Sequence, residues 1–164
     1  MPEYNVENQE FTKTPQELID QTIEKVSGFL NKNFPSHLAF GSGQFTLKRG
    51  TSQVMIIVRA FTADDTSVEF ISNVVTGAAI TPELMKFLLR KNAELHFGAF
   101  GLLFDDTISF SYSIAGKNLD ENEFDTAMLS VAIIADYYDE MIVEMAGGKR
   151  ACDVALSDFE DMQL

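Results

Sequence analysis

Four acidic side chains in one helical stretch have the types and the spacing to carry chemistry. They are Asp136, Asp139, Glu140 and Glu144. Asp136 and Glu140 are four residues apart, as are Glu140 and Glu144, so each pair shares one face of a helix. Such pairs can coordinate a divalent cation or act as general acid and base. Because no histidine stands three or four residues from any of them, a solvated acidic helix face is the favoured interpretation.

The other candidate groups form no catalytic or binding motif. His37 and His96 are far apart in the sequence, and neither neighbours a cysteine or a serine motif. The glycines of Gly41–Gly43 and Gly98–Gly101 are too close together for a phosphate-binding loop, and no Lys-Ser or Lys-Thr pair follows them. The single Cys152 excludes an intrachain disulfide and a cysteine metal cluster. We therefore expect no catalytic residue, no cofactor and no metal ligand, and a protein that is not an enzyme.

Composition and net charge argue against several classes of binding partner. The chain has 164 residues, 46% of them hydrophobic, which suits one domain with a substantial core. Its formal net charge of −13 argues against binding of nucleic acid or an anionic membrane, because a negative surface repels phosphate. No apolar run approaches the roughly 18 residues of a membrane span. The polar, acidic N-terminus does not have the pattern of a signal peptide, and together these features predict a cytoplasmic protein.

The first half of the chain is expected to form one helix and three strands. The sequence Thr-Pro-Gln-Glu is a capping box, with Thr14 as the N-cap and Glu17 at the third helical position. The helix that it opens should run to about Asn33, because Pro35 stops it. β-branched and aromatic residues then dominate three predicted strands: Gln44–Lys48, Gln53–Phe61 and Ser67–Thr76.

A short helix and a hairpin are expected next. Thr81 is a good N-cap, and Pro82 suits the first helical position, so a helix begins here and ends near Asn92. Apolar residues alternate strictly with serine in Ile108–Ile114, which predicts an antiparallel strand with one solvent-exposed face. The hairpin strands are Phe97–Phe104 and Ile108–Ile114, joined by a turn at Asp105-Asp106.

The last predicted helix is long. Asp120 caps its start, Glu123 occupies the third position, and Gly147-Gly148 ends it. One continuous apolar seam runs along it at four-three spacing, so Val131 and Ala135 in the middle of this seam should be fully buried. The seam consists of Phe124, Met128, Val131, Ala135, Tyr138, Ile142 and Met145, while Leu129 and Ile133 lie on the opposite side.

These elements predict an α+β fold of two layers, an antiparallel sheet with helices mostly on one side, in the order α-β-β-β-α-β-β-α. We expect a flexible N-terminal segment over residues 1–13, a single domain over residues 14–150, and an acidic C-terminal tail over residues 151–164. The tail carries four acidic residues and bulky apolar ones that include Leu156, Phe159 and Met162, so it is either loose or a short docking helix.

The helix that begins at Pro82 is more apolar than one sheet requires. A helix on a sheet needs an apolar stripe only about 100° wide, and this helix has nearly twice that, with Met85 and Leu89 as the surplus. Either the helix lies between two layers of its own core, or the surplus forms an interface. The second reading predicts a homodimer or another protein partner, with Met85 and Leu89 in the contact and Lys86 and Arg90 near its rim.

A family resemblance rests on the second half of the chain. The segment ITPELMKFLLRKNAELHFGAFGLLFDDTISFSYSIAGKNLDENEF resembles the YbjN-type domain of the type III secretion chaperone-like fold. The shared features are a proline-capped helix rich in leucine, a two-strand hairpin and an L-D-x-x-E-F entry to a long helix. The continuation VAIIADYYDEMIVEMAGGKRA resembles small cyanobacterial proteins of the same group. The resemblance implies a compact α+β protein without catalysis, often dimeric, whose relatives bind other proteins.

Two functions from different classes remain. The first is a non-enzymatic protein-binding or chaperone-like module that acts as a dimer, which the excess of apolar surface favours. The second is an enzyme that binds a small molecule or a divalent metal through the acidic face of the last helix.

Overall fold

A seven-stranded antiparallel sheet forms one layer of the fold, in the strand order β1-β2-β3-β4-β6-β5 with β7 paired to β4. The computed structural model describes residues 13–154. Residues 1–12 of the expected flexible segment and residues 155–164 of the expected tail therefore lie outside the described residues. The strands are β1 (Leu38–Gly41), β2 (Gln44–Arg49), β3 (Ser52–Ala60), β4 (Thr66–Thr76), β5 (Ala99–Leu102), β6 (Ile108–Ala115) and β7 (Lys149–Arg150).

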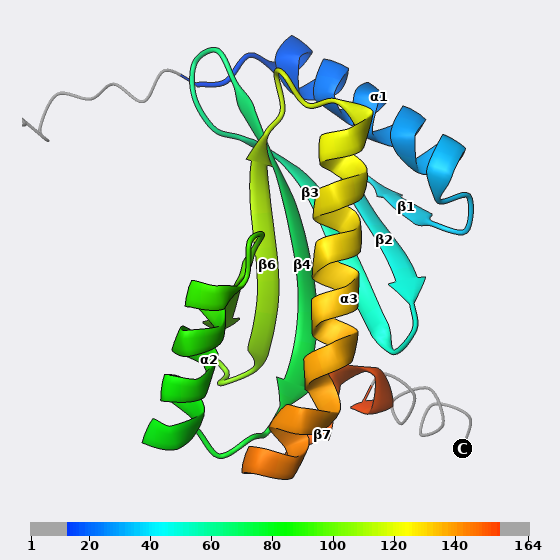
Figure 1. Ribbon diagram of the computed structural model, residues 1–164. Helices are drawn as coiled ribbons and strands as arrows, with labels where there is room; N and C mark the ends of the chain where they lie inside the picture. Colours follow the sequence, from blue (N-terminus) through cyan, green and yellow to red (C-terminus); the bar gives the residue numbers. More distant parts are fainter. Residues whose placement is uncertain (1–12, 155–164) are drawn as a thin grey trace, which may run out of the picture.

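Three helices form the second layer, all on the same face of the sheet (Figure 1). They are α1 (Gln16–Asn33), α2 (Pro82–Glu94) and α3 (Glu121–Ala146). The long helix α3 lies along β4 and β6, α1 lies over the β3 side of the sheet, and α2 lies over β5 at the other edge. The two-layer α+β arrangement predicted from the sequence is confirmed. Among residues 13–154, none of the helices combines the length and the apolarity needed to cross a membrane.

Two strands were absent from the predicted order. β1 is only four residues long and all of its residues are exposed, so its sequence shows no alternation of buried and exposed side chains. β7 is a two-residue strand that pairs with the end of β4 through Val75 and Thr76. Each of these segments is a strand because its backbone forms hydrogen bonds with a neighbouring strand. The sequence of so short a segment contains no pattern that predicts this pairing.

The predicted helix caps were right at α2 and α3 and wrong at α1. The Thr81 side chain accepts a hydrogen bond from the Leu84 N–H, and Asp120 forms a complete capping box with Glu123. Pro15, not Thr14, is the N-cap of α1, and no side chain caps that helix. The Thr14 hydroxyl forms hydrogen bonds with a distant segment of the chain instead of capping the helix.

The Thr14 hydroxyl ties the start of α1 to the β3–β4 connection. It donates to the Thr62 carbonyl at 2.7 Å and accepts from the Phe61 N–H at 3.0 Å. Because these two bonds satisfy a buried polar group, they replace the local cap that the sequence pattern indicated.

The core lies between α3 and the sheet. Val131 and Ala135 are buried as predicted, at 0% and 2% exposure. The Phe124 ring packs against Phe70 of β4 and Phe29 of α1, with ring centroids 5.3 and 5.5 Å apart. The seam ends earlier than predicted, because Met145 in the last turn of α3 is exposed.

Candidate functional site

The acidic residues of α3 hold the turn between β2 and β3. The Thr51 N–H donates to Asp136 Oδ1 at 2.6 Å, and the Thr51 hydroxyl contacts both Asp136 and Asp139, with 2.8 Å to Asp139 Oδ2. Glu140 pairs with Arg150, with 3.1 Å between Oε1 and the guanidinium. Three of the four carboxylates singled out in the sequence therefore bind groups of the chain itself.

Gly50 lets this turn approach α3 closely. Its φ of +60° is in the left-handed region, and a Cβ at this position would lie 2.6 Å from Asp136 Oδ1. Hydrogen bonds from Thr51 lower the pKa of Asp136 below its ordinary value. Among residues 13–154, no group of three or more histidine, cysteine, aspartate or glutamate side chains is arranged to hold a metal ion. The geometry gives these acids a structural role in anchoring the turn.

Acidification should weaken this anchor. Because the folded-state pKa of Asp136 is lowered, its ionised form stabilises the native state above the ordinary aspartate pKa, and this contribution is lost as the pH falls through the folded-state pKa. We expect Asp136→Asn to cost about 1 kcal/mol of unfolding free energy at neutral pH. The difference from the wild type should narrow below about pH 4, as measured by urea unfolding across a pH series.

The matched control for this prediction is Glu144→Gln. It removes the same charge from an exposed position on the same helix. Identical stability–pH profiles for Asp136→Asn and Glu144→Gln would show that the bonds to Thr51 do not stabilise the fold.

The two histidines and the cysteine lie in different parts of the fold. His37 Nδ1 lies 2.8 Å from the Phe34 carbonyl just after α1, and its ring contacts Phe45 edge-on. The His96 ring lies edge-on to Phe97 in the α2–β5 connection. Burial and the neighbouring Asp153 raise the pKa of the Cys152 thiol, which is the opposite of what a nucleophilic thiolate needs.

A groove runs between α1 and the edge strand β1. It has a volume of about 610 Å³, and Ile19 and Ile23 of α1 face Ala39 and Phe45 across it. Within residues 13–154, β1 pairs with β2 alone, so in this part of the chain its other edge presents unpaired backbone N–H and C=O groups beside the groove. The large side chains of β1, Leu38 and Phe40, are exposed.

Gly43 lies in the lining of this groove, where the β1–β2 turn meets α1. Its φ is +74°, and a Cβ here would lie 2.9 Å from Ile23 Cγ1, so only glycine lets the β1–β2 turn pack directly on α1. Sequence reasoning missed the groove because it missed β1. The combination of Gly41, Gly43 and flanking apolar residues was the available signal.

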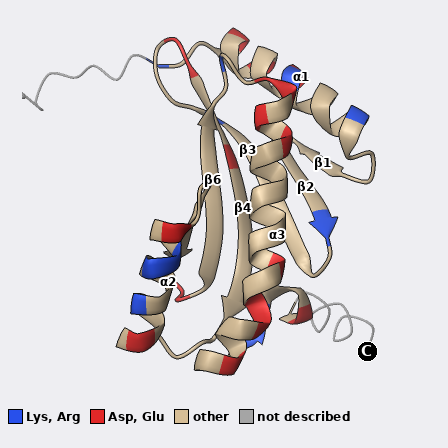
Figure 2. Cartoon of the chain, viewed as in Figure 1, with Lys and Arg blue, Asp and Glu red and all other residues tan. Residues whose placement is uncertain are grey.

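The surplus apolar residues of α2 lie on a second exposed surface, at the opposite edge of the sheet. Met85 and Leu89 border a hollow of about 200 Å³ together with Leu102 of β5. Only Leu84 is fully buried on α2, so the alternative of a helix between two core layers is wrong. Lys86 and Arg90 are exposed, and Figure 2 shows the basic bands of α2.

Asn92 joins α2 to the edge strand β5. Its Nδ2 donates to the Phe100 carbonyl at 3.1 Å, and its Oδ1 accepts from the Phe100 N–H at 2.7 Å. The side-chain amide thus pairs with the backbone as a neighbouring strand would. Among the described residues β5 pairs otherwise with β6 alone, and Leu102, Leu103 and Phe104 are exposed at its end. We call the exposed residues Met85, Leu89 and Leu102 the α2–β5 surface.

One family model matches most of the chain, and solved structures share its fold. The family model described as T3SS (YopN, CesT) and YbjN peptide-binding chaperone 1, or TY-Chap1, matches residues 15–154. A chain in the crystal structure of the ExsC–ExsE complex has a similar fold, with a TM-score of 0.58, 15% identity, and coverage of 76% of this chain and 96% of that chain. A chain in the HopA1–SchA chaperone–effector complex also has a TM-score of 0.58, at 13% identity and with the same coverage.

No curated protein matched the sequence. At these identities the two solved structures establish the likeness of fold alone, whereas the family model covers most of the chain. The chain therefore belongs to the TY-Chap1 family of peptide-binding chaperones related to type III secretion chaperones and YbjN.

Proposed function

We propose that this protein is a non-enzymatic chaperone that binds an extended segment of another protein along the free edge of β1. The observation that carries the proposal is the unpaired edge of β1 beside the α1–β1 groove. A peptide added as a further strand would satisfy the backbone groups of β1, and alternate side chains of the peptide would enter the groove. Membership of a peptide-binding family and the presence of a chaperone–effector complex among proteins of similar fold support this function.

The groove also defines the kind of peptide. Ile19, Ile23 and Phe45 offer apolar contacts, while Asp20 lies among the lining residues. The net charge of −13 attracts cationic chains over a longer range. The best ligand is therefore an extended segment in which apolar residues alternate with basic ones.

Phe40→Lys should disrupt this binding without disturbing the fold. A lysine on an edge strand opposes the addition of a further strand, because its charge would have to be desolvated. We expect about a tenfold loss of affinity, or roughly 1.4 kcal/mol, for a short fluorescent peptide in which valine alternates with lysine. Fluorescence anisotropy measures the affinity, and hydrogen exchange at residues 38–41 should slow when the peptide binds the wild type.

Phe61→Lys is the matched control. Phe40 and Phe61 are exposed to 67% and 66%, so both variants add the same charge at equal exposure, but only Phe40 is on β1. Equal loss of affinity in the two variants, or none in either, would contradict binding at β1.

We further propose that the protein is a homodimer whose two copies meet through their α2–β5 surfaces. A two-fold contact would cover Met85, Leu89 and Leu102 with their own copies. Lys86 and Arg90 would then lie near the rim, where charges contribute little energy. This arrangement leaves both β1 edges, at the opposite ends of the sheets, open to a bound segment.

A further inference from the structure

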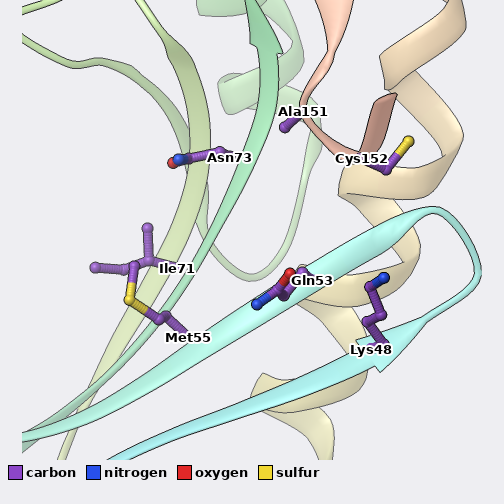
Figure 3. A pocket seen from close by; sticks show the side chains of 7 residues that line it. All are labelled: Lys48, Gln53, Met55, Ile71, Asn73, Ala151 and Cys152. Carbon is purple, nitrogen blue, oxygen red and sulfur yellow. The ribbon is translucent and has the colours of Figure 1, made fainter. Parts of the chain in front are cut away.

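The face of the sheet opposite the helices has an apolar centre that is uncovered in residues 13–154. Met55 of β3 and Ile71 of β4 are paired neighbours on this face, and Met55 is 44% exposed. Together with Gln53, Asn73 and Lys48 they line a hollow of about 220 Å³, which Figure 3 shows at close range. We call this region the open-face hollow. It contains sheet side chains from β2, β3 and β4.

The residues that follow α3 lead toward this hollow. Gly148, with a φ of +86°, passes so close to β4 that a Cβ would lie 2.6 Å from the Thr76 carbonyl oxygen. β7 then pairs with the end of β4, and Arg150 is held by Glu140 at 3.1 Å and by Asp153 at 2.9 Å. These contacts fix the path of the chain around the end of the sheet.

The next residues reach the hollow itself. Ala151 and Cys152 are part of its lining, and Figure 3 shows them on the side of the hollow away from Met55 and Ile71. Residues 151–154 are helical. The segment that follows, residues 155–164, therefore starts beside the hollow.

We propose that residues 155–164 dock on the open-face hollow of their own chain. Leu156, Phe159 and Met162 repeat at three-residue spacing, so a helix would present them along one side, toward Met55 and Ile71. Ten residues of helix extend ~15 Å, which suffices to cross from β4 to β2, two strand spacings or ~10 Å apart.

The charges of residues 155–164 and of the open-face hollow also favour this docking. The segment carries Asp158, Glu160 and Asp161, and Lys48 is an exposed cation at the β2 side of the hollow. Glu69, an acidic residue on the same face, is already paired with Arg59 at 2.7 Å. An acidic segment with several apolar side chains suits a hollow that has an apolar centre and one cation, Lys48, at its edge.

A single tryptophan tests the proposal, because the chain contains none of its own. In Phe159→Trp, we expect blue-shifted emission and quenching by acrylamide several-fold weaker than that of a free tryptophan. Adding Met55→Asp should restore solvent-like emission. The matched control is Met85→Asp, since Met85 on α2 is 45% exposed and lies away from the hollow, and it should leave the emission unchanged.

Three results would overturn the proposal. The first is solvent-like emission from Phe159→Trp itself, which would mean that the segment is not docked. The second is buried emission that Met55→Asp does not alter, which would place the segment elsewhere. The third is a blue shift that disappears on dilution, which would show that the segment docks on another copy of the chain.

Discussion

Replacing Val131 by aspartate is expected to prevent folding. Val131 is fully buried in the middle of α3, where the helix packs on the sheet. A carboxylate at this position would have no cationic partner, and burying an unpaired charge costs several kcal/mol, a large fraction of the ~5–15 kcal/mol that stabilises a typical domain. We expect the variant to be insoluble on expression or, if soluble, to show no cooperative thermal transition by circular dichroism.

Ile133→Asp provides the control two residues further along the same helix. Ile133 is 49% exposed, so its replacement adds the same charge and the same helix propensity without burying the carboxylate. It should melt close to the wild type. A soluble Val131→Asp variant with native melting behaviour would contradict the packing of α3 described above.

The double variant Met85→Glu, Leu89→Lys is expected to convert a dimer into a monomer. Both side chains are exposed on α2, so the change removes apolar surface from the α2–β5 surface without touching the core. In a two-fold contact each substituted residue would occur twice, and removing these charged groups from water would cost more free energy than their pairing returns. Size-exclusion chromatography with light scattering at high micromolar concentration measures the mass.

A second double variant, Met55→Glu with Leu38→Lys, makes the same kind of change away from α2. Both residues are exposed on other strands, and this variant should remain a dimer. A monomeric wild type would contradict the dimer and leave the α2–β5 surface for a different partner. A dimer that survives in both double variants would place the contact on another surface.

The sequence by itself determined the parts of the fold that depend on near neighbours. The caps at Thr81 and Asp120 join groups only three residues apart, so their patterns predict them without knowledge of the rest of the chain. The seam of α3 predicted the burial of Val131 and Ala135, because helical periodicity determines which side chains share a face. The two-layer α+β arrangement follows from these elements, since each must bury one apolar face.

The sequence also identified Met85 and Leu89 as surplus apolar residues, and the structure shows both exposed. It could not say what lies beside them. Leu102 joins them only because Asn92 binds the backbone of β5 and so brings that strand against α2. The surface is thus predictable in part from one helix and completed by a tertiary contact.

Only the tertiary structure decided the role of the acidic residues and the position of the groove. Asp136 anchors Thr51, 85 residues away, and no local pattern carries information about that pairing. The Thr14 hydroxyl likewise binds the backbone of Phe61 and Thr62 and does not cap α1. β1 exists as a strand because β2 pairs with it, and the groove exists because Gly43 allows α1 to approach. These features depend on contacts between distant segments, and such contacts form only when the whole chain has folded.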